Sequence, residues 1–292
     1  MRARVVILSV MRLRALVPPL YLILVVGCGS TAPGLGPSPP AQPSTATATL
    51  TDTVTGAVVG TSAQPVSTFP ALLTFSHPGY VTRQLWLQHA QATVDLIPEA
   101  GFDLTFYRQF VRGALDGRME PLRRLPQAPS LYLQTAGLSP ATVAALEHAA
   151  RTAVHEFSGR TMGVVSVERG ESLPADRVGW ITIELIADAD GACGRAFVGT
   201  RIGHVWLSTQ RPSCTRPMTH TLAHEIGHAM GFWHVDDHTA LMHATRPVSH
   251  SGQLSPQERH HAALAYARLP GNQDIDRDPM TPATFSTYVV LD

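Results

Sequence analysis

Three histidines, a glutamate and a glycine lie within eleven residues, in the run His224-Glu225-Ile-Gly-His228-Ala-Met-Gly231-Phe-Trp-His234. On a helix, side chains four residues apart face the same side, so His224 and His228 can chelate one ion. Gly231 accepts backbone dihedrals that other residues resist, which lets the chain leave the helix and bring His234 to the same ion. Neutral imidazoles suit zinc, and three protein ligands leave the fourth tetrahedral position open, as in catalytic sites.

Glu225 follows the first of these ligands and points about 100° away from it around the helix. It is therefore better placed to reach a zinc-activated water than the ion itself, and we expect it to act as general base. A buried, non-catalytic zinc staple is the simpler alternative, but it explains neither Glu225 nor the missing fourth protein ligand. The expected site holds one zinc ion on His224, His228 and His234.

The run resembles the H-E-x-x-H-x-x-G-x-x-H signature of the metzincin clan of zinc metalloproteases. The resemblance extends to Ala240-Leu-Met242, which lies at the spacing of the methionine turn in the matrix-metalloproteinase-like members, or matrixins. It implies that Met242 forms a hydrophobic base beneath the ligands without binding the metal, and that Glu258 supports this turn. The similarity covers about Ser130 to Arg268, and its specific part is His224–Met242.

Several positions depart from the matrixin pattern. Val235 stands where matrixins commonly have serine, and Gln257 replaces the first of two acids expected in the final helix. The proline expected soon after the methionine is displaced to Pro247, so the resemblance does not define the wall of the specificity pocket. The sequence has no cysteine-switch motif and no tyrosine two positions after Met242, and no acidic loop is dense enough to support calcium.

The elements that must position these residues follow an α/β order. Periodicity and punctuation predict one sheet, the zinc-binding helix and a C-terminal helix, which is the mixed α/β (α+β) class that a metzincin-like fold implies. The expected strands are Ser130–Thr135, Met162–Glu168, Trp180–Ile186, Arg195–Thr200 and His204–Ser208, and the expected helices are Ser139–Gly159, Met218–Met230 and Ser255–Arg268.

Short alternating runs between residues 48 and 100 predict a small all-β sandwich. This unit resembles the carboxypeptidase-regulatory-like or PEGA-like modules of secreted bacterial enzymes. It contains no cluster of titratable residues, so we interpret it as a spacer or adhesive module. Residues 101–292 then form the expected catalytic domain, with its core at residues 130–268.

The first 28 residues are typical of an export signal. Arginines precede an apolar run of about a dozen residues, which is short for a membrane span. The ending Val25-Val26-Gly27-Cys28 resembles a bacterial lipobox, which implies lipidation of Cys28; an ordinary signal or uncleaved anchor is the alternative. Residues 29–47 are an uncharged Pro/Ser/Thr-rich linker. We therefore expect an exported protein that a lipid anchors in the bacterial cell envelope, a location compatible with the outer membrane. An extracellular protein is the alternative.

Cys193 and Cys214 remain once Cys28 is set aside, and two such thiols in an exported protein usually pair. Zinc ligation by either cysteine is the alternative, disfavoured because the histidines complete the site. With 22 Lys+Arg against 22 Asp+Glu, the formal net charge is zero. This balance provides no general attraction to nucleic acid.

Other polar residues near the motif have simpler interpretations. His220 continues the face of the ligand histidines, but we interpret it as a helix residue or a hydrogen-bond donor behind the ligands. His238 and His243 are expected in surface loops. Asp236 or Asp237 is a candidate for orienting a ligand imidazole, with ordinary solvation of the loop as the alternative.

These observations predict a zinc-dependent metalloendopeptidase that hydrolyses peptide bonds in polypeptides with Glu225 as general base. The substrate would be an extended polypeptide along an edge strand near Arg195–Leu207, bound through its backbone. The alternatives are a non-catalytic surface binding or adhesion lipoprotein that retains the zinc site, and a zinc hydrolase of non-peptide amides.

Overall fold

The computed structural model describes residues 43–210, 214, 217–245, 251–286 and 290–291. The chain divides into two compact units, Met1–Ala41 and Gln42–Asp292, and only the second contains described residues. The export signal, the predicted lipidation site Cys28 and most of the predicted linker therefore lie outside the described residues, as does Pro247. Among the described residues, no helix is both long and apolar enough to cross a membrane.

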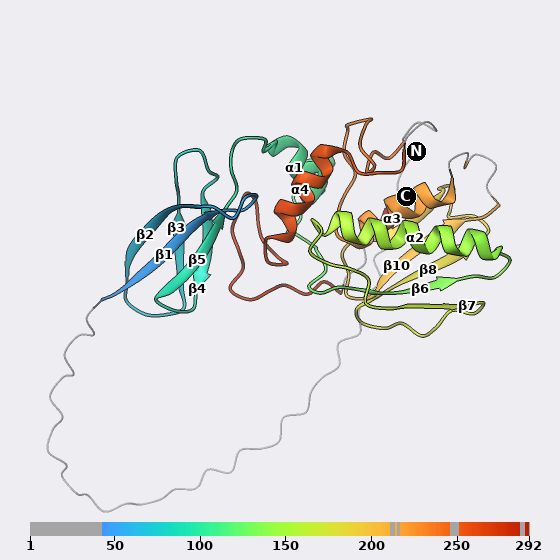
Figure 1. Cartoon of the computed structure of the whole chain (residues 1–292), viewed down its shortest axis with the longest axis horizontal. Coiled ribbons are helices and arrows are strands. Elements are labelled where there is room, and N and C mark those ends of the chain that lie inside the picture. The colour runs from blue at the N-terminus through green and yellow to red at the C-terminus, as the bar shows by residue number, and fades with distance from the viewer. Residues whose placement is uncertain (1–42, 211–213, 215–216, 246–250, 287–289, 292) are drawn as a thin grey trace, which may run out of the picture. The chain divides into compact units, whose positions relative to one another are not determined.

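The first part of the described chain is built only from strands. A three-stranded sheet has the order β2-β1-β5, in which β1 pairs antiparallel with β2 and parallel with β5. A second sheet pairs β3 with β4 (Figure 1). Alternate side chains from these strands are buried between the sheets, among them Leu50, Phe75 and Val94. The strands are β1 Ser44–Asp52, β2 Val58–Val66, β3 Ala71–Phe75, β4 Arg83–Leu87 and β5 Gln91–Leu96.

The remaining strands form one six-stranded mixed sheet of order β11-β9-β10-β8-β6-β7. The four strands β7, β6, β8 and β10 are parallel, whereas β9 runs antiparallel to β10 and β11 antiparallel to β9. The strands are β6 Ser130–Gln134, β7 Val167–Gly170, β8 Trp180–Ile186, β9 Gly194–Phe197, β10 Gly203–Ser208 and β11 Val290–Leu291.

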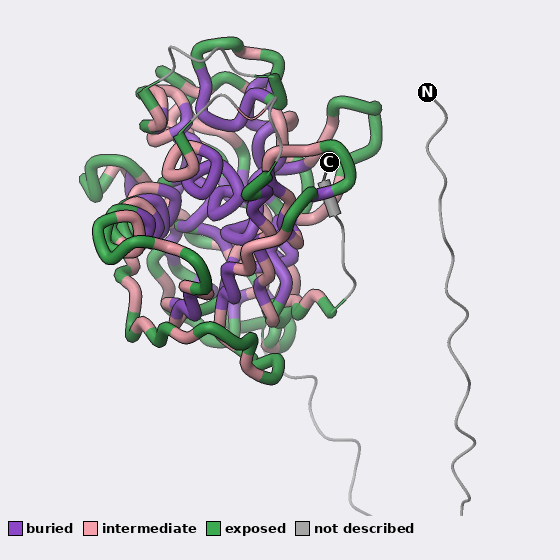
Figure 2. Tube along the Cα trace, turned by 90° about the vertical axis from the view of Figure 1, so that its right-hand side faces the viewer, coloured by how far each residue is buried: buried purple, intermediate pink, exposed green. Residues whose placement is uncertain are grey.

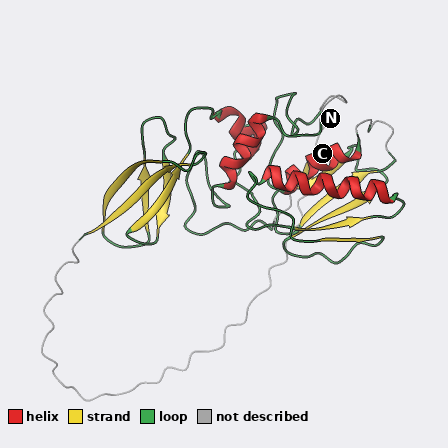
Figure 3. Cartoon of the chain, viewed as in Figure 1, coloured by secondary structure: helices red, strands yellow, loops and turns green. Residues whose placement is uncertain are grey.

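Four α-helices accompany this sheet: α1 Leu104–Arg112, α2 Pro140–Phe157, α3 Met218–Ala229 and α4 Pro256–Tyr266, with a short 3₁₀ turn, η1, at Ala114–Asp116 (Figure 3). Ser139 caps α2 by accepting from the Thr142 N–H, and Ser255 begins α4 with a capping box. Buried residues fill the interior of the α/β part (Figure 2), and the rings of Phe110, Phe157 and Phe232 pack together in its apolar core.

The mixed α/β class with a helix carrying the histidine motif and a C-terminal helix is confirmed. Two strand predictions need correction. The strand expected at Met162–Glu168 is β7 at Val167–Gly170, because only those residues pair with β6, whereas Val165 is 70% exposed. The strand expected at Arg195–Thr200 ends at Phe197, because the chain turns at Gly199 with φ 55° against the Arg123 carbonyl.

Buried ion pairs join the all-β unit (strands β1 to β5) to the C-terminal segment of the chain. Arg83 of β4 donates to Asp278 at 2.5 Å and lies 3.9 Å from Asp276, which also accepts from Arg268 of the same C-terminal segment at 2.7 and 2.8 Å. The side chains of Arg268 and Asp276 are fully buried. Backbone bonds from Gln84 to Asp276 and from Asp278 to Gln84 run beside these pairs. The all-β unit is therefore held against the chain that follows α4.

Candidate metal centre

Helix α3 presents two histidines on one side and apolar residues on another. Leu222, Ile226 and Ala229 are fully buried, and α3 packs against α2, β9 and β10. His224 and His228 lie one turn apart and are 5% and 1% exposed. The spacing of the apolar residues thus fixes the rotation of α3, and with it the direction of both imidazoles.

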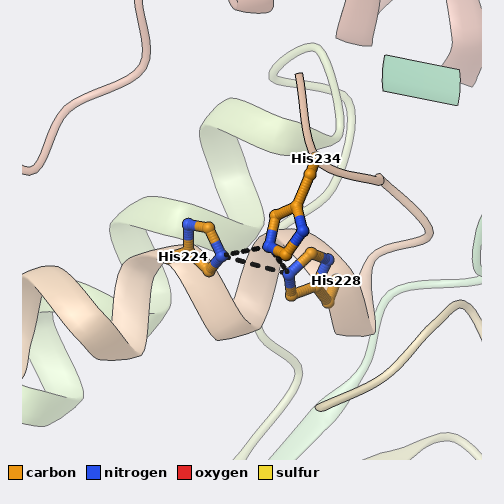
Figure 4. Close-up of side chains that lie close together, drawn as sticks. All are labelled: His224, His228 and His234. Atoms are coloured by element: carbon orange, nitrogen blue, oxygen red, sulfur yellow. Dashed lines mark hydrogen bonds between the residues drawn. The ribbon is translucent and has the colours of Figure 1, made fainter. Parts of the chain in front are cut away.

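The three predicted ligands converge on one point (Figure 4). The Nε2 atoms of His224 and His228 are 3.1 Å apart, and each lies 3.2 Å from Nε2 of His234. With zinc–nitrogen bonds near 2.05 Å, a tetrahedral zinc ion separates its ligand nitrogens by about 3.3 Å. The three nitrogens therefore have the size of one face of a zinc tetrahedron. They are the one group of three or more possible metal ligands among the described residues.

The opposite ring nitrogens of the two helical ligands are fixed by backbone carbonyls. Nδ1 of His224 lies 2.7 Å from the Leu241 oxygen, and Nδ1 of His228 lies 2.7 Å from the Phe232 oxygen. A carbonyl can only accept, so each Nδ1 carries the proton and each Nε2 keeps its lone pair for a metal. Such partners orient a ligand ring and increase its basicity.

Gly231 makes the turn that returns the chain to the metal centre. Its φ of 107° lies in the region that favours glycine, and a Cβ there would lie 2.8 Å from the Arg123 carbonyl oxygen. Hydrogen bonds from Gly231 N–H to the His228 oxygen and from Phe232 N–H to the Gly227 oxygen close the end of α3. The half-buried His234 then faces His224 and His228.

Met242 is fully buried. A Cβ on Gly227 of α3 would lie 2.5 Å from the Met242 sulfur, so this glycine allows the turn to approach the helix. Glu258 of α4 holds the turn by accepting from the N–H groups of Leu241 at 2.9 Å and Met242 at 2.8 Å. Burial raises the pKa of Glu258, while its backbone N–H donors act in the opposite direction.

Glu225 lies between α3 and the outer part of the sheet and is 5% exposed. A Cβ on Gly194 of β9 would lie 2.7 Å from Oε1 of Glu225, so the glycine leaves room for this carboxylate. Cys193 precedes β9 directly and forms a disulfide with Cys214, four residues before α3 begins. The disulfide therefore ties the start of β9 to the approach to the ligand helix.

The sheet corrects the expected position of an edge strand near Arg195–Leu207. Strand β10 is internal, because it pairs with β8 on one side and β9 on the other. Strand β9 is the outer of the two, and β11 pairs with part of it, placing Val290 opposite Phe197 and Leu291 opposite Ala196. Gly194 and Arg195 lie outside that pairing. The backbone edge nearest Glu225 is therefore the first half of β9.

The other polar residues of the motif region do not join the three ligands. His220 packs on Gly252 at the wall of a separate cavity of about 510 Å³. The rings of His238 and His243 contact each other with centroids 4.3 Å apart. The side chain of Asp237 accepts from Thr239. The prediction that an aspartate orients a ligand ring is wrong for His224 and His228, since carbonyls have that role.

A cavity of about 370 Å³ adjoins the third ligand, and sequence reasoning missed its lining. His234 and Trp233 form one side, and the segment after α1 forms the other. The lining residues from that segment are Gly113, Leu115, Asp116, Arg118 and Glu120. The only sequence signals in that segment are Gly113 and Gly117, which predict turns but not where the segment lies in the fold. Both glycines have positive φ in the structure.

Comparison with solved structures gives partial likenesses, among them a zinc protease. High choriolytic enzyme 1, a hatching enzyme zinc-protease from Oryzias latipes (medaka fish), is 16% identical with a TM-score of 0.33, over 50% of this chain and 94% of that one. No protein-family model and no curated protein matches the chain. The chain thus contains a three-histidine group able to hold a metal ion, and it is similar in part to a zinc protease.

Proposed function

We propose that this protein is a zinc-dependent metalloendopeptidase of the metzincin clan, similar to matrixins. The observation that carries the proposal is the triangle of Nε2 atoms, with sides of 3.1 and 3.2 Å, in a protein that also buries Glu225 beside it on α3. A structural zinc staple would need a fourth protein ligand, and none lies with the three histidines among the described residues.

Bound zinc would supply a Lewis acid that polarises a carbonyl and lowers the pKa of water. Glu225 would take a proton from the attacking water and return it to the leaving amine. The absence of a side chain at Gly194 leaves room for the Glu225 carboxylate beside β9. His224 and His228, with Nδ1 fixed on carbonyls, would hold their position as charge develops.

The substrate in this proposal is an extended polypeptide. The outer edge of β9 at Gly194 lies beside Glu225 and outside the residues that pair with β11 in the described part of the chain. An extended peptide can add to such an edge as a further strand. This mode recognises the peptide backbone, and the cavity beside His234 is placed to contact a side chain.

The test replaces Glu225 with glutamine in the full chain, with Glu168→Gln as matched control on the exposed part of β7. We expect zinc to remain bound and cleavage of a mixed peptide library to fall by about 10²-fold or more, since general-base catalysis contributes about 10²–10⁴-fold. The control should cleave as the wild type does. Undiminished, zinc-dependent cleavage by Glu225→Gln would refute the mechanism.

The same assay separates the rival functions. Zinc binding without hydrolysis of any peptide would favour a binding or adhesion protein, and hydrolysis of small amides alone would favour a non-peptide amidase.

We also propose, from the sequence, an exported protein with a lipid on Cys28. Mass analysis of the native N-terminus tests this, and an unmodified Cys28 would contradict it.

A further inference from the structure

Helix α1, which precedes the six-stranded sheet in the chain, forms hydrogen bonds with the loop that carries His234. The Trp233 N–H donates to the Phe110 carbonyl at 2.8 Å, one residue before the ligand. Two residues after the ligand, Gln109 Nε2 donates to Asp236 Oδ2 at 2.8 Å. The Asp236 N–H donates back to Gln109 Oε1 at 3.2 Å. Adjacent residues of α1 therefore bind the chain on both sides of His234.

Helix α1 is firmly placed against this loop. The Phe110 ring stacks on Phe232 with centroids 4.3 Å apart. The helix ends at Gly113 with φ 64°, and a Cβ there would lie 2.8 Å from the Trp233 ring. The Arg112 side chain is fully buried and donates to the Asn272 side chain at 2.5 Å. A movement of the His234 loop away from α1 would break several of these contacts.

The third ligand depends on such support more than the other two do. His224 and His228 are fixed by the helix that carries them and by carbonyls on Nδ1. His234 is half-buried and comes from a loop after Gly231, so the position of its backbone depends on what the loop contacts. A ligand already held in place loses less freedom when the metal binds.

We propose that Gln109 is a positioning residue for His234, acting through Asp236. Helix α1 therefore contributes to the geometry of the metal centre. This inference rests on the proposed zinc site. Gln109 uses both ends of its amide, one on the side chain and one on the backbone of Asp236. That pairing fixes the position as well as the direction of the loop.

The experiment measures metal affinity in the full chain by competition with a chromogenic chelator, together with the visible spectrum of the Co²⁺-substituted protein. We expect Gln109→Ala to weaken zinc binding by about 3- to 10-fold. This is less than the roughly 10- to 100-fold typical of a group bonded directly to a ligand. The Co²⁺ bands should shift because the third nitrogen becomes less ordered. Gln64→Ala is the matched control, since Gln64 of β2 donates its amide to the carbonyl of Thr74 on β3, in the all-β unit.

A rescue pair separates positioning from general damage to the fold. Gln109→Glu alone sets two carboxylates against each other and should weaken zinc binding by at least as much as alanine. The double variant Gln109→Glu/Asp236→Asn restores the pairing, because a carboxylate at 109 can accept from both the amide and the backbone N–H at 236. Zinc affinity and the Co²⁺ spectrum should return to within about 2-fold of the wild type.

Wild-type zinc affinity and an unchanged Co²⁺ spectrum in Gln109→Ala would overturn the proposal, as would a double variant no better than Gln109→Glu. Both readouts are independent of hydrolysis. A protein whose zinc affinity depends on the Gln109–Asp236 pair but that cleaves no peptide would therefore contradict the proposed function and support the inference. If Gln109→Ala does not fold, the comparison of the Gln109→Glu variant with the double variant decides the question.

Discussion

Gly194 provides a direct test of how the structure places Glu225. A Cβ at this position would lie 2.7 Å from Oε1 of Glu225, 2.8 Å from Cγ and 2.9 Å from Cδ. Ordinary contact distances are about 3.5 Å, so Gly194→Ala requires the carboxylate to retreat by about 0.7 Å. Misplacement of a reacting group by about 1 Å can cost about 10²-fold. We therefore expect kcat/KM for a peptide substrate to fall by about 10- to 100-fold, or roughly 1.4 to 2.8 kcal/mol.

The same substitution should leave the metal ligands in place, because the three atoms nearest to the added Cβ all belong to Glu225. Zinc content and thermal unfolding are measured beside kcat/KM, and Gly163→Ala is the control because a Cβ there has no neighbour within 4 Å. A Gly194→Ala protein that binds zinc and cleaves at the wild-type rate would refute the reasoning. Loss of zinc together with activity would show that the substitution damages more than the position of Glu225.

Three further outcomes are expected. Glu258→Ala leaves the buried N–H groups of Leu241 and Met242 without their acceptor, which should cost about 2 to 6 kcal/mol in urea unfolding; a cost below 1 kcal/mol would contradict the assigned role. Burial lowers the pKa of His261, so its contribution to stability is full above about pH 6.5 and is lost as pH falls through the folded value. In metal-free protein, the free energy of unfolding of His261→Gln relative to wild type should therefore be higher at pH 5.5 than at pH 7.5, and an equal difference at both pH values would argue against it. Removing residues 287–292 frees the part of β9 that pairs with β11, so amide exchange at Ala196 should quicken and KM for an extended peptide should fall; unchanged exchange would mean that this pairing is not formed in solution.

The ligand set could be predicted because its spacing is local. The positions of His224 and His228 on one helical face follow from the chain alone, and the glycine at 231 predicts the turn that brings in His234. The partners of their rings could not be predicted, since any residue supplies a backbone carbonyl and only the fold brings Leu241 and Phe232 to the imidazoles.

The contribution of α1 was missed for a related reason. Its capping by Asp103 and its end at Gly113 are readable signals, but they predict only that a helix exists. Its position beside the His234 loop depends on contacts between residues more than a hundred positions apart, as in the pair Gln109–Asp236. The pairing of the β9 edge with β11 is equally non-local, because β11 comes from the last residues of the sequence.

The buried ion pairs between the all-β unit and the chain after α4 affect how the protein folds and how it can be divided. Cutting the chain between residues 100 and 101 would remove Arg83 and leave the Asp278 carboxylate buried without its cation. Breaking a buried pair from one side costs about 3 to 5 kcal/mol, a large share of the stability of a typical domain. The two parts should therefore unfold in one cooperative transition, and the all-β unit does not behave as an independently folding domain that can be exchanged.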